Sequence, residues 1–328
     1  MKHEAWNMKH KTINNEQNCN YLIGVDGGGT KTVAAISDLN GRILGMAKAG
    51  PSNPRNVGIK ETTRQISLAI SQLLKSVPAE NGKILATIIG LAGVKEEFEN
   101  KKEEIKEEIR KYPEAAAIFE GKIEISNDQI VAFRSAKKGR DGLVLISGTG
   151  SVCHGWNKNK EAKTSGWGWL NDEGSAFWAG QEAFRAMFRD LDGRGPKTLI
   201  TKIAFQALKA KSEDDFLLRI YYGNPTFVVP LFSIYCNQAA RKGDQVAKKI
   251  MTAAGQELAL AAKTVIKKLG FANKNFPVVL IGGMFKSDLV LMTVKKEIKK
   301  LAPQAVFVLP REDPVIGAIE LAKDVLQK

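Results

Sequence analysis

Three short glycine turns hold the residues of this sequence whose types and spacing could do chemistry. Each turn follows an apolar stretch typical of a strand; the turns are DGGGT at 26–30, SGTGS at 147–151 and GGMFKS at 282–287. Glycine lets the backbone approach an anion and turn its amide groups toward it. Hydroxyl donors come from Thr30, Thr149 and Ser151. One such turn alone is typical of a tight hairpin, whereas three indicate a phosphate chain held between turns.

Two better-known phosphate motifs are excluded. A P-loop needs a lysine directly after its second glycine, and Gly24 and Gly29 have the right spacing but are followed by Thr30. The dinucleotide fingerprint needs spaced glycines and a following helix, whereas three contiguous glycines precede a β pattern at residues 32–37.

The carboxylate of Asp26 stands directly before the first glycine turn. A carboxylate beside phosphate-binding amides is reasonable if a cation lies between the two. Magnesium accepts few protein carboxylates, keeps water ligands and bridges phosphates. Asp26 is therefore predicted to orient hydrated Mg²⁺ on a nucleotide. Lys31 has two open interpretations, a phosphate contact or a solvated turn lysine.

Composition and charge narrow the class of protein. The chain has 328 residues, of which 44% are hydrophobic and 26% charged, and the length suggests roughly two domains. No apolar run reaches the length of about 18 residues that a membrane span needs, so we expect no membrane partner. The net charge is +14, but the lysines are dispersed among glutamates as on solvated helix faces, which argues against a nucleic-acid partner.

The cysteines and the first residues indicate a cytoplasmic protein. The three cysteines are far apart without any CxxC pair, so neither a disulfide framework nor a structural zinc site is expected. The three histidines form no metal cluster, and His154 is interpreted as a hydrogen-bonded strand residue. Residues 1–20 are polar and lack the apolar core of a secretion signal. They are interpreted as a disordered leader.

The order of predicted elements repeats along the chain. Strand, glycine turn, strand, polar turn and strand occur over 21–49 and again from residue 142 onward. Helical patterns cover the segments 58–76, 95–112, 174–190, 198–221 and 229–269, and a last helix begins near Pro314. The sequence thus predicts two related α/β halves with a cleft between them and a boundary near residue 133.

Six motifs in order resemble one known family. GVDGGGTKT, SNDQIVA, LISGTGSVC, GWGWLNDEGSAFW, LIGGMFKS and DPVIGAIELA resemble the N-acetylglucosamine kinase branch of the BadF/BadG/BcrA/BcrD ATPase family, within the actin, Hsp70 and sugar-kinase superfamily. The resemblance implies two ribonuclease-H-like domains, residues 21–133 and 134–312, that close over ATP and an amino sugar. It also implies that the helix 313–328 packs back on the first domain.

The resemblance implies a role for each motif. It assigns the catalytic base to Asp128 and sugar contacts to Asn53, Asp128, Gly166 and Asp172. It assigns the nucleotide to the glycine turns; these residues are Gly28, Gly29, Thr30, Lys31, Gly148, Thr149, Gly150, Ser151, Gly282 and Gly283. Helix capping is an alternative or additional role for Asp128 and Asp172, and an ordinary turn residue is the alternative for Asn53.

The implied activity is ATP- and Mg²⁺-dependent phosphorylation of an amino sugar by a homodimeric enzyme. N-acetylglucosamine or glucosamine, converted to the 6-phosphate, is the expected substrate. The segment GWGWLNDEGS has one residue fewer between GWG and DEG than the family pattern, with Asn171 where glycine is common, so the identity of the sugar stays open. The alternative function is an ATPase activator of a 2-hydroxyacyl-CoA dehydratase or benzoyl-CoA reductase system, which would hold an iron–sulfur cluster.

Overall fold

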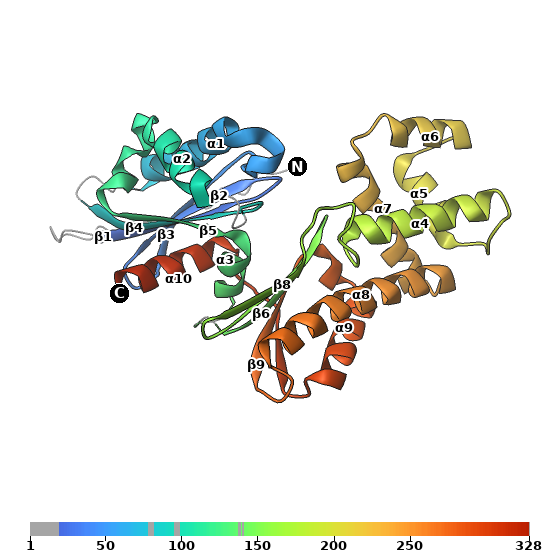
Figure 1. Cartoon of the computed structure of the whole chain (residues 1–328). Helices are drawn as coiled ribbons and strands as arrows, with labels where there is room; N and C mark the ends of the chain where they lie inside the picture. The colour runs from blue at the N-terminus through green and yellow to red at the C-terminus, as the bar shows by residue number, and fades with distance from the viewer. Residues whose placement is uncertain (1–19, 78–81, 95–98, 137–138, 140, 328) are drawn as a thin grey trace, which may run out of the picture.

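Two five-stranded sheets with the same strand order form the framework of the molecule (Figure 1). The structure is a computed structural model of the chain, and it describes residues 20–77, 82–94, 99–136, 139 and 141–327. The predicted leader 1–20 therefore lies outside the described residues, except for Asn20, which begins strand β1. Among the described residues, no helix combines the length and the apolar character that crossing a membrane requires.

The first sheet has the order β3-β2-β1-β4-β5. Its strands are β1 (Asn20–Gly27), β2 (Thr32–Asp38), β3 (Ile43–Ala49), β4 (Lys83–Leu91) and β5 (Lys122–Asn127). Strands β1, β2 and β3 pair antiparallel, whereas β1, β4 and β5 pair parallel. The apolar stretch before DGGGT forms a central strand because Tyr21–Val25 are all buried.

The second sheet repeats this topology in the order β8-β7-β6-β9-β10. Its strands are β6 (Gly142–Ser147), β7 (Ser151–Asn157), β8 (Lys160–Ser165), β9 (Phe276–Ile281) and β10 (Ala305–Val308). The same two antiparallel and two parallel strand pairs recur. This repeated order confirms the α/β, ribonuclease-H-like fold that the sequence predicts. The domain boundary near residue 133 stays a prediction, with which the two sheets are compatible.

The helices of the first half cover its sheet. They are α1 (Pro54–Ser76), α2 (Glu99–Arg110), a 3-10 helix (Pro113–Glu120) and α3 (Asp128–Arg134). Helix α1 packs on β2 and β3 and contributes Ile66, Ile70 and Leu73 to the core on that face.

The second half has a larger helical layer. Its helices are α4 (Ala176–Leu191), α5 (Leu199–Leu208), α6 (Glu213–Tyr221), α7 (Pro225–Arg241), α8 (Gln245–Leu269), a 3-10 helix (Gly283–Lys286) and α9 (Asp288–Leu301). The predicted helical segments 198–221 and 229–269 were each wrong in one respect, because each is divided into two helices. Left-handed Lys209 ends α5 before Ser212 caps α6, and Asp244 starts α8 after Lys242 ends α7.

The last helix, α10 (Val315–Leu326), lies against the first sheet although it follows the second in the chain (Figure 1). It packs on β1, β4 and α3 in a core that includes Leu22, Val131 and Ile319. The packing is close, since a Cβ on Gly24 would lie 2.9 Å from the carbonyl oxygen of Val315. This is the arrangement that the family resemblance implies for helix 313–328.

Candidate active site

The first glycine turn joins β1 to β2 and rests on the segment that precedes α1. The Gly28 N–H donates to the Lys31 carbonyl at 2.9 Å, and the Ser52 N–H donates to the Gly28 carbonyl at 3.0 Å. The buried Thr32 hydroxyl lies 2.7 Å from both the Gly50 carbonyl and the Ser52 hydroxyl. The base of the turn is thus fixed, while Gly29 and Thr30 are exposed at its tip, as a phosphate site requires.

The second glycine turn joins β6 to β7 and lies against the N-terminus of α4. The Gly148 N–H donates to the Gly150 carbonyl at 2.9 Å, which closes the turn, and Thr149 is exposed at its tip. The Ala176 N–H, in the first turn of α4, donates to the Gly148 carbonyl at 2.8 Å. The two halves therefore present equivalent turns at equivalent positions of their sheets.

Asp172 fixes the loop that follows β8 to the second glycine turn. It is 4% exposed, and its carboxylate accepts the Ser151 N–H at 3.2 Å and the Trp167 N–H at 2.9 Å. Burial raises the pKa of Asp172, and these backbone donors oppose that shift. Gly166 has a φ of +72° and donates its N–H to the Ser151 carbonyl at 2.8 Å. The structure thus gives Asp172 a loop-positioning role, and its sugar contact, like that of Gly166, stays a prediction.

The third glycine turn, predicted for the adenosine, packs on the second turn. Gly282 has a φ of +116°, and a Cβ there would lie 2.1 Å from the Ser147 carbonyl oxygen. Glycine is therefore required at position 282 for β9 to end against β6. Gly282 and Gly283 are both exposed, so a ligand can reach the two turns together.

Two carboxylates from distant parts of the sequence, Asp128 and Asp313, act electrostatically on Asp26 in the first half. Asp26 is the last residue but one of β1, Asp128 begins α3, and Asp313 precedes α10. The pKa of Asp26 is raised to about 7, chiefly by burial and also by the negative charges of Asp128 and Asp313, while Lys31 opposes the shift. Burial also raises the pKa of Asp128. The structure thus places the predicted metal residue and the predicted base in one electrostatic site.

Lys31 and Asp313 link the first glycine turn to the start of α10. The Lys31 Nζ lies 3.8 Å from the Asp313 Oδ2, and the buried Oδ1 of Asp313 makes no hydrogen bond. The sequence reasoning did not select Asp313. Its position directly before Pro314, at the start of a helix expected to return to the first half, is the signal that could have identified it.

A cation would fit among the carboxylates of Asp26, Asp128 and Asp313 if water or phosphate supplied most of its ligands. Within the described residues, no group of three or more histidine, cysteine or acidic side chains is arranged to hold a metal ion. Magnesium keeps several waters and is commonly bound through one or two carboxylates together with substrate phosphates. Asp26, at the end of β1 beside the first glycine turn, has the chemistry for that role.

Asn53 caps α1, and its side chain also faces the end of β4. Its Oδ1 accepts the Arg55 N–H at 3.0 Å, and a Cβ on Gly93 would lie 2.5 Å from this oxygen. The Arg55 Nε donates to the Gly93 carbonyl at 2.9 Å. The capping role is therefore present, and it is compatible with the sugar contact that stays predicted for Asn53.

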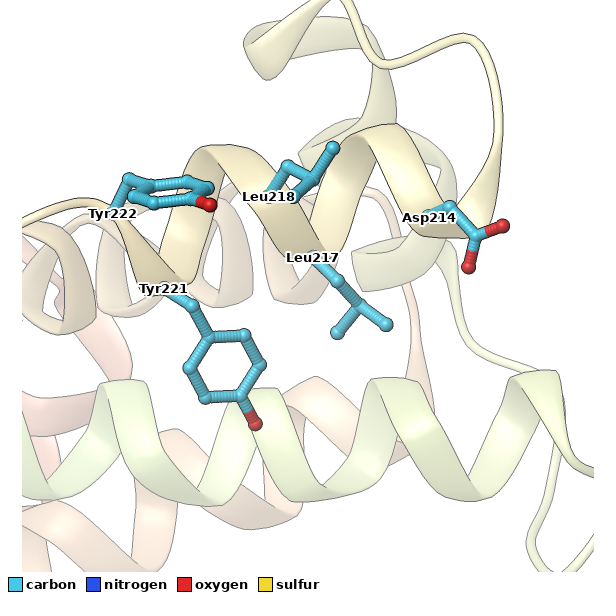
Figure 2. Close-up of a pocket in the computed structure, with 5 residues that line it drawn as sticks. All are labelled: Asp214, Leu217, Leu218, Tyr221 and Tyr222. Atoms are coloured by element: carbon cyan, nitrogen blue, oxygen red, sulfur yellow. The ribbon is translucent and has the colours of Figure 1, made fainter.

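A surface pocket of about 410 Å³ lies on α6, away from every predicted site residue. Figure 2 shows Leu217 and Tyr221 pointing to one side of α6 and Leu218 and Tyr222 lying on the other. Tyr221 and Tyr222 are 74% and 87% exposed. Asp214 is the one carboxylate among its lining residues, and these include no glycine turn or cationic side chain that could bind a phosphate chain. The glycine turns and the three carboxylates of the first half therefore remain the candidate active site.

Solved structures with this fold are sugar kinases and related proteins. A candidate N-acetylglucosamine kinase from Chromobacterium violaceum superposes with a TM-score of 0.71, at 23% identity over 93% of this chain and 100% of that one. A ROK family glucokinase from Streptomyces griseus, solved with glucose and AMPPNP, superposes with a TM-score of 0.60 at 17% identity over 94% of this chain and 100% of that one. These similarities define the class of fold, that of sugar kinases and actin-like ATPases.

Sequence comparison defines the family. The model of the BadF/BadG/BcrA/BcrD ATPase family matches residues 23–322, and the chain belongs to this family. It is 32% identical over 307 residues to the N-acetylmuramic acid/N-acetylglucosamine kinase of Clostridium acetobutylicum, covering 92% of this chain and 98% of that protein. It is 30% identical over 316 residues to the N-acetyl-D-glucosamine kinase of Dictyostelium discoideum, covering 92% of this chain and 97% of that protein.

Proposed function

We propose that this protein is an ATP- and Mg²⁺-dependent kinase that phosphorylates an amino sugar, with N-acetylglucosamine as the first candidate and glucosamine as the second. The 6-hydroxyl is the proposed acceptor. The observation that carries the proposal is the shared electrostatic site of Asp26 and Asp128, beside the first glycine turn. The names of the two relatives support the choice of an N-acetylated amino sugar.

In the proposed reaction, each group of site residues has a separate role. The first two glycine turns would bind the phosphates, and Gly282 and Gly283 would border the adenosine. Asp26 would orient the hydrated cation, which neutralises charge on the transferred phosphoryl group. Asp128 would accept the proton of the sugar hydroxyl. Its raised pKa makes it a stronger base than an exposed aspartate, while Asn53, Gly166 and Asp172 would place the sugar.

The test is a panel of hexoses and amino hexoses with ATP and Mg²⁺, read by ADP release and by product mass. We expect N-acetylglucosamine to stimulate ADP release and to gain the mass of one phosphoryl group, with the position assigned by NMR of the product. Asp128→Asn serves as the inactive control. A panel in which no sugar stimulates ADP release would overturn the kinase function.

The ATPase-activator alternative predicts brisk hydrolysis without sugar and bound iron. Cys153 and Cys236 are buried in β7 and α7 respectively, and burial raises the pKa of Cys236 to about 12 and raises that of Cys153 as well. Neither thiol lies at the surface, where an iron–sulfur cluster shared by two subunits would need its ligands. Cys19 lies outside the described residues. An iron assay on the purified protein discriminates the two functions.

The homodimer and the cytoplasmic location are part of the same proposal. Light scattering at several protein concentrations measures the oligomeric state, and fractionation of the source cells measures the location.

A further inference from the structure

The hairpin β7–β8 presents a polar face to the first half of the molecule. His154 pairs directly with Lys163 and Trp156 with Glu161, so all four side chains lie on one face of the hairpin. Trp156 packs on Phe133 of α3, with ring centroids 5.7 Å apart. This face therefore meets the helix that begins with the predicted base.

A chain of polar contacts runs from that base through this interface. The Gln129 Nε2 donates to the Asp128 Oδ1, and the Gln129 Oε1 lies 3.3 Å from the His154 Nδ1. The His154 Nε2 contacts the Glu161 Oε1. Gln129 and His154 are 9% and 3% exposed, whereas the Glu161 side chain is 53% exposed. This series of polar contacts thus crosses from α3 to β7 and ends at the surface on β8.

The donors and acceptors in this series of contacts limit which protonation states of the His154 imidazole are compatible with it. Gln129 uses its N–H group on Asp128, so its oxygen faces His154 and requires a proton on Nδ1. The Glu161 carboxylate is an acceptor and requires a proton on Nε2. Only a doubly protonated imidazole meets both requirements, whereas a neutral ring with the proton on Nδ1 keeps the contact to Gln129.

We propose that Gln129 and His154 are positioning residues for Asp128 and form a polar bridge between the two halves of the molecule. The inference rests on the proposed kinase function. An oriented donor helps to hold a carboxylate in one rotamer, and a donor to its ionised form favours that form. The Gln129 side chain supplies such a donor beside the backbone N–H groups of Asp128 and Gln129, and the contact to His154 keeps its amide from turning its oxygen toward Asp128.

The charged groups around the bridge come from three elements. Asp128 lies on α3, Asp26 on β1, and Glu161 and Lys163 on β8. Burial lowers the pKa of His154, Glu161 opposes that shift, and Lys163 adds to it. Lys163 also opposes the upward shift that burial causes in the pKa of Asp128. The bridge is thus surrounded by charges of both signs that can shift with pH.

The first test removes the donor to Asp128. Gln129→Leu should lower kcat about tenfold or more, the scale of a lost hydrogen bond to a charged group, with the KM for ATP nearly unchanged. The acid limb of the kcat–pH profile should move to higher pH, because the ionised carboxylate loses a donor. Gln206→Leu is the same substitution at an exposed glutamine on α5. It should change neither kcat nor the position of the acid limb.

The second test asks whether the bridge acts through Asp128. In the Asp128→Asn background, Gln129→Leu should add little further loss of kcat. The same fold-loss in both backgrounds would show a general structural role and overturn the proposal. His154→Asn keeps an N–H near the position of Nδ1 and should retain the wild-type pH profile, whereas His154→Phe should shift the acid limb as Gln129→Leu does.

The third test does not depend on turnover. The pKa of the His154 imidazole, followed by NMR, should fall in Gln129→Leu, because the protonated ring loses its acceptor, and should stay unchanged in Gln206→Leu. An unchanged His154 pKa in Gln129→Leu would overturn the bridge even in an active kinase. Absence of sugar-dependent turnover in the wild-type protein would instead overturn the kinase function and, with it, the positioning role.

Discussion

At the scale of single residues, two partly buried carboxylates determine what the site can do. Asp26 and Asp128 come from two strand ends of the same sheet, and burial raises the pKa of both. We propose that Asp26 orients a cation and that Asp128 accepts a proton. Their substitutions should therefore have different consequences for activity.

Replacing the predicted base should abolish most of the turnover and leave the nucleotide site intact. We expect Asp128→Asn to lower kcat about 10²-fold or more, the usual scale for loss of a general base. The affinity for a non-hydrolysable ATP analogue should be nearly unchanged, because the glycine turns remain. Steady-state kinetics and calorimetric titration measure the two quantities, and near wild-type turnover would exclude Asp128 as the base.

Magnesium binding should depend on pH through Asp26. The pKa of Asp26 is about 7, so a cation that needs the ionised form must displace a proton below that pH. The apparent affinity for Mg²⁺ should therefore strengthen as pH rises through about 7. Asp26→Asn should weaken the affinity and remove this pH dependence. A magnesium titration of the variant that superimposes on the wild-type curves at every pH would contradict the assignment.

The same carboxylate should destabilise the fold at high pH. Its pKa rises on folding from 3.8 to about 7, so between these values the folded state binds more protons than the unfolded state. Stability then falls as pH rises through this window, and the whole penalty is present above pH 7. Asp26→Asn should raise the Tm more at pH 8 than at pH 5, as calorimetry would measure. An equal change at both pH values would show that the charge is not the cause.

At the scale of elements, the ends of the strands decide how the glycine turns meet. The turn after β9 reaches the turn after β6 because position 282 carries no side chain. Gly282→Ala places a Cβ 2.1 Å from the Ser147 carbonyl oxygen, in a backbone with φ of +116°. We expect a loss of about 1–3 kcal/mol or more in stability and weaker nucleotide binding.

Gly283→Ala is the matched control for this prediction. A Cβ on Gly283 meets no atom within 4 Å, and its φ lies outside the positive range. Its Tm should stay near that of the wild-type protein, as a thermal-shift measurement would show. Equal loss of stability in both variants would mean that the contact with Ser147 is not the reason for glycine at position 282.

At the scale of the whole molecule, phosphoryl transfer requires residues of both halves to act together. The first glycine turn and Asp128 belong to one sheet, and the second and third turns belong to the other. Water must be excluded, since otherwise ATP would be hydrolysed. We expect sugar and nucleotide together to reduce the radius of gyration in small-angle scattering, and hydrolysis without sugar to be slow. An unchanged radius together with rapid sugar-independent hydrolysis would favour the ATPase-activator function.

The sequence by itself determined the local features of this protein. Apolar runs followed by glycine turns are set by short-range chemistry, so the central strands and the glycine turns that follow them could be predicted, as could the repeat of the two halves. The segments 198–221 and 229–269 were less predictable, because their breaks at Lys209 and Asp244 depend on caps that resemble ordinary polar helix residues. The short strand β10 was missed, since four residues carry too little periodicity.

Tertiary structure alone decided which distant residues share a site. Asp313 reaches Asp26 because α10 crosses back to the first sheet, and His154 reaches Gln129 because side chains of β7 contact side chains of α3. Neither pair is close in sequence, and neither has a pattern that marks it. Burial and neighbouring charge also set the pKa values of Asp26 and Asp128, since both depend on the atoms that surround a group in space and not on its neighbours along the chain.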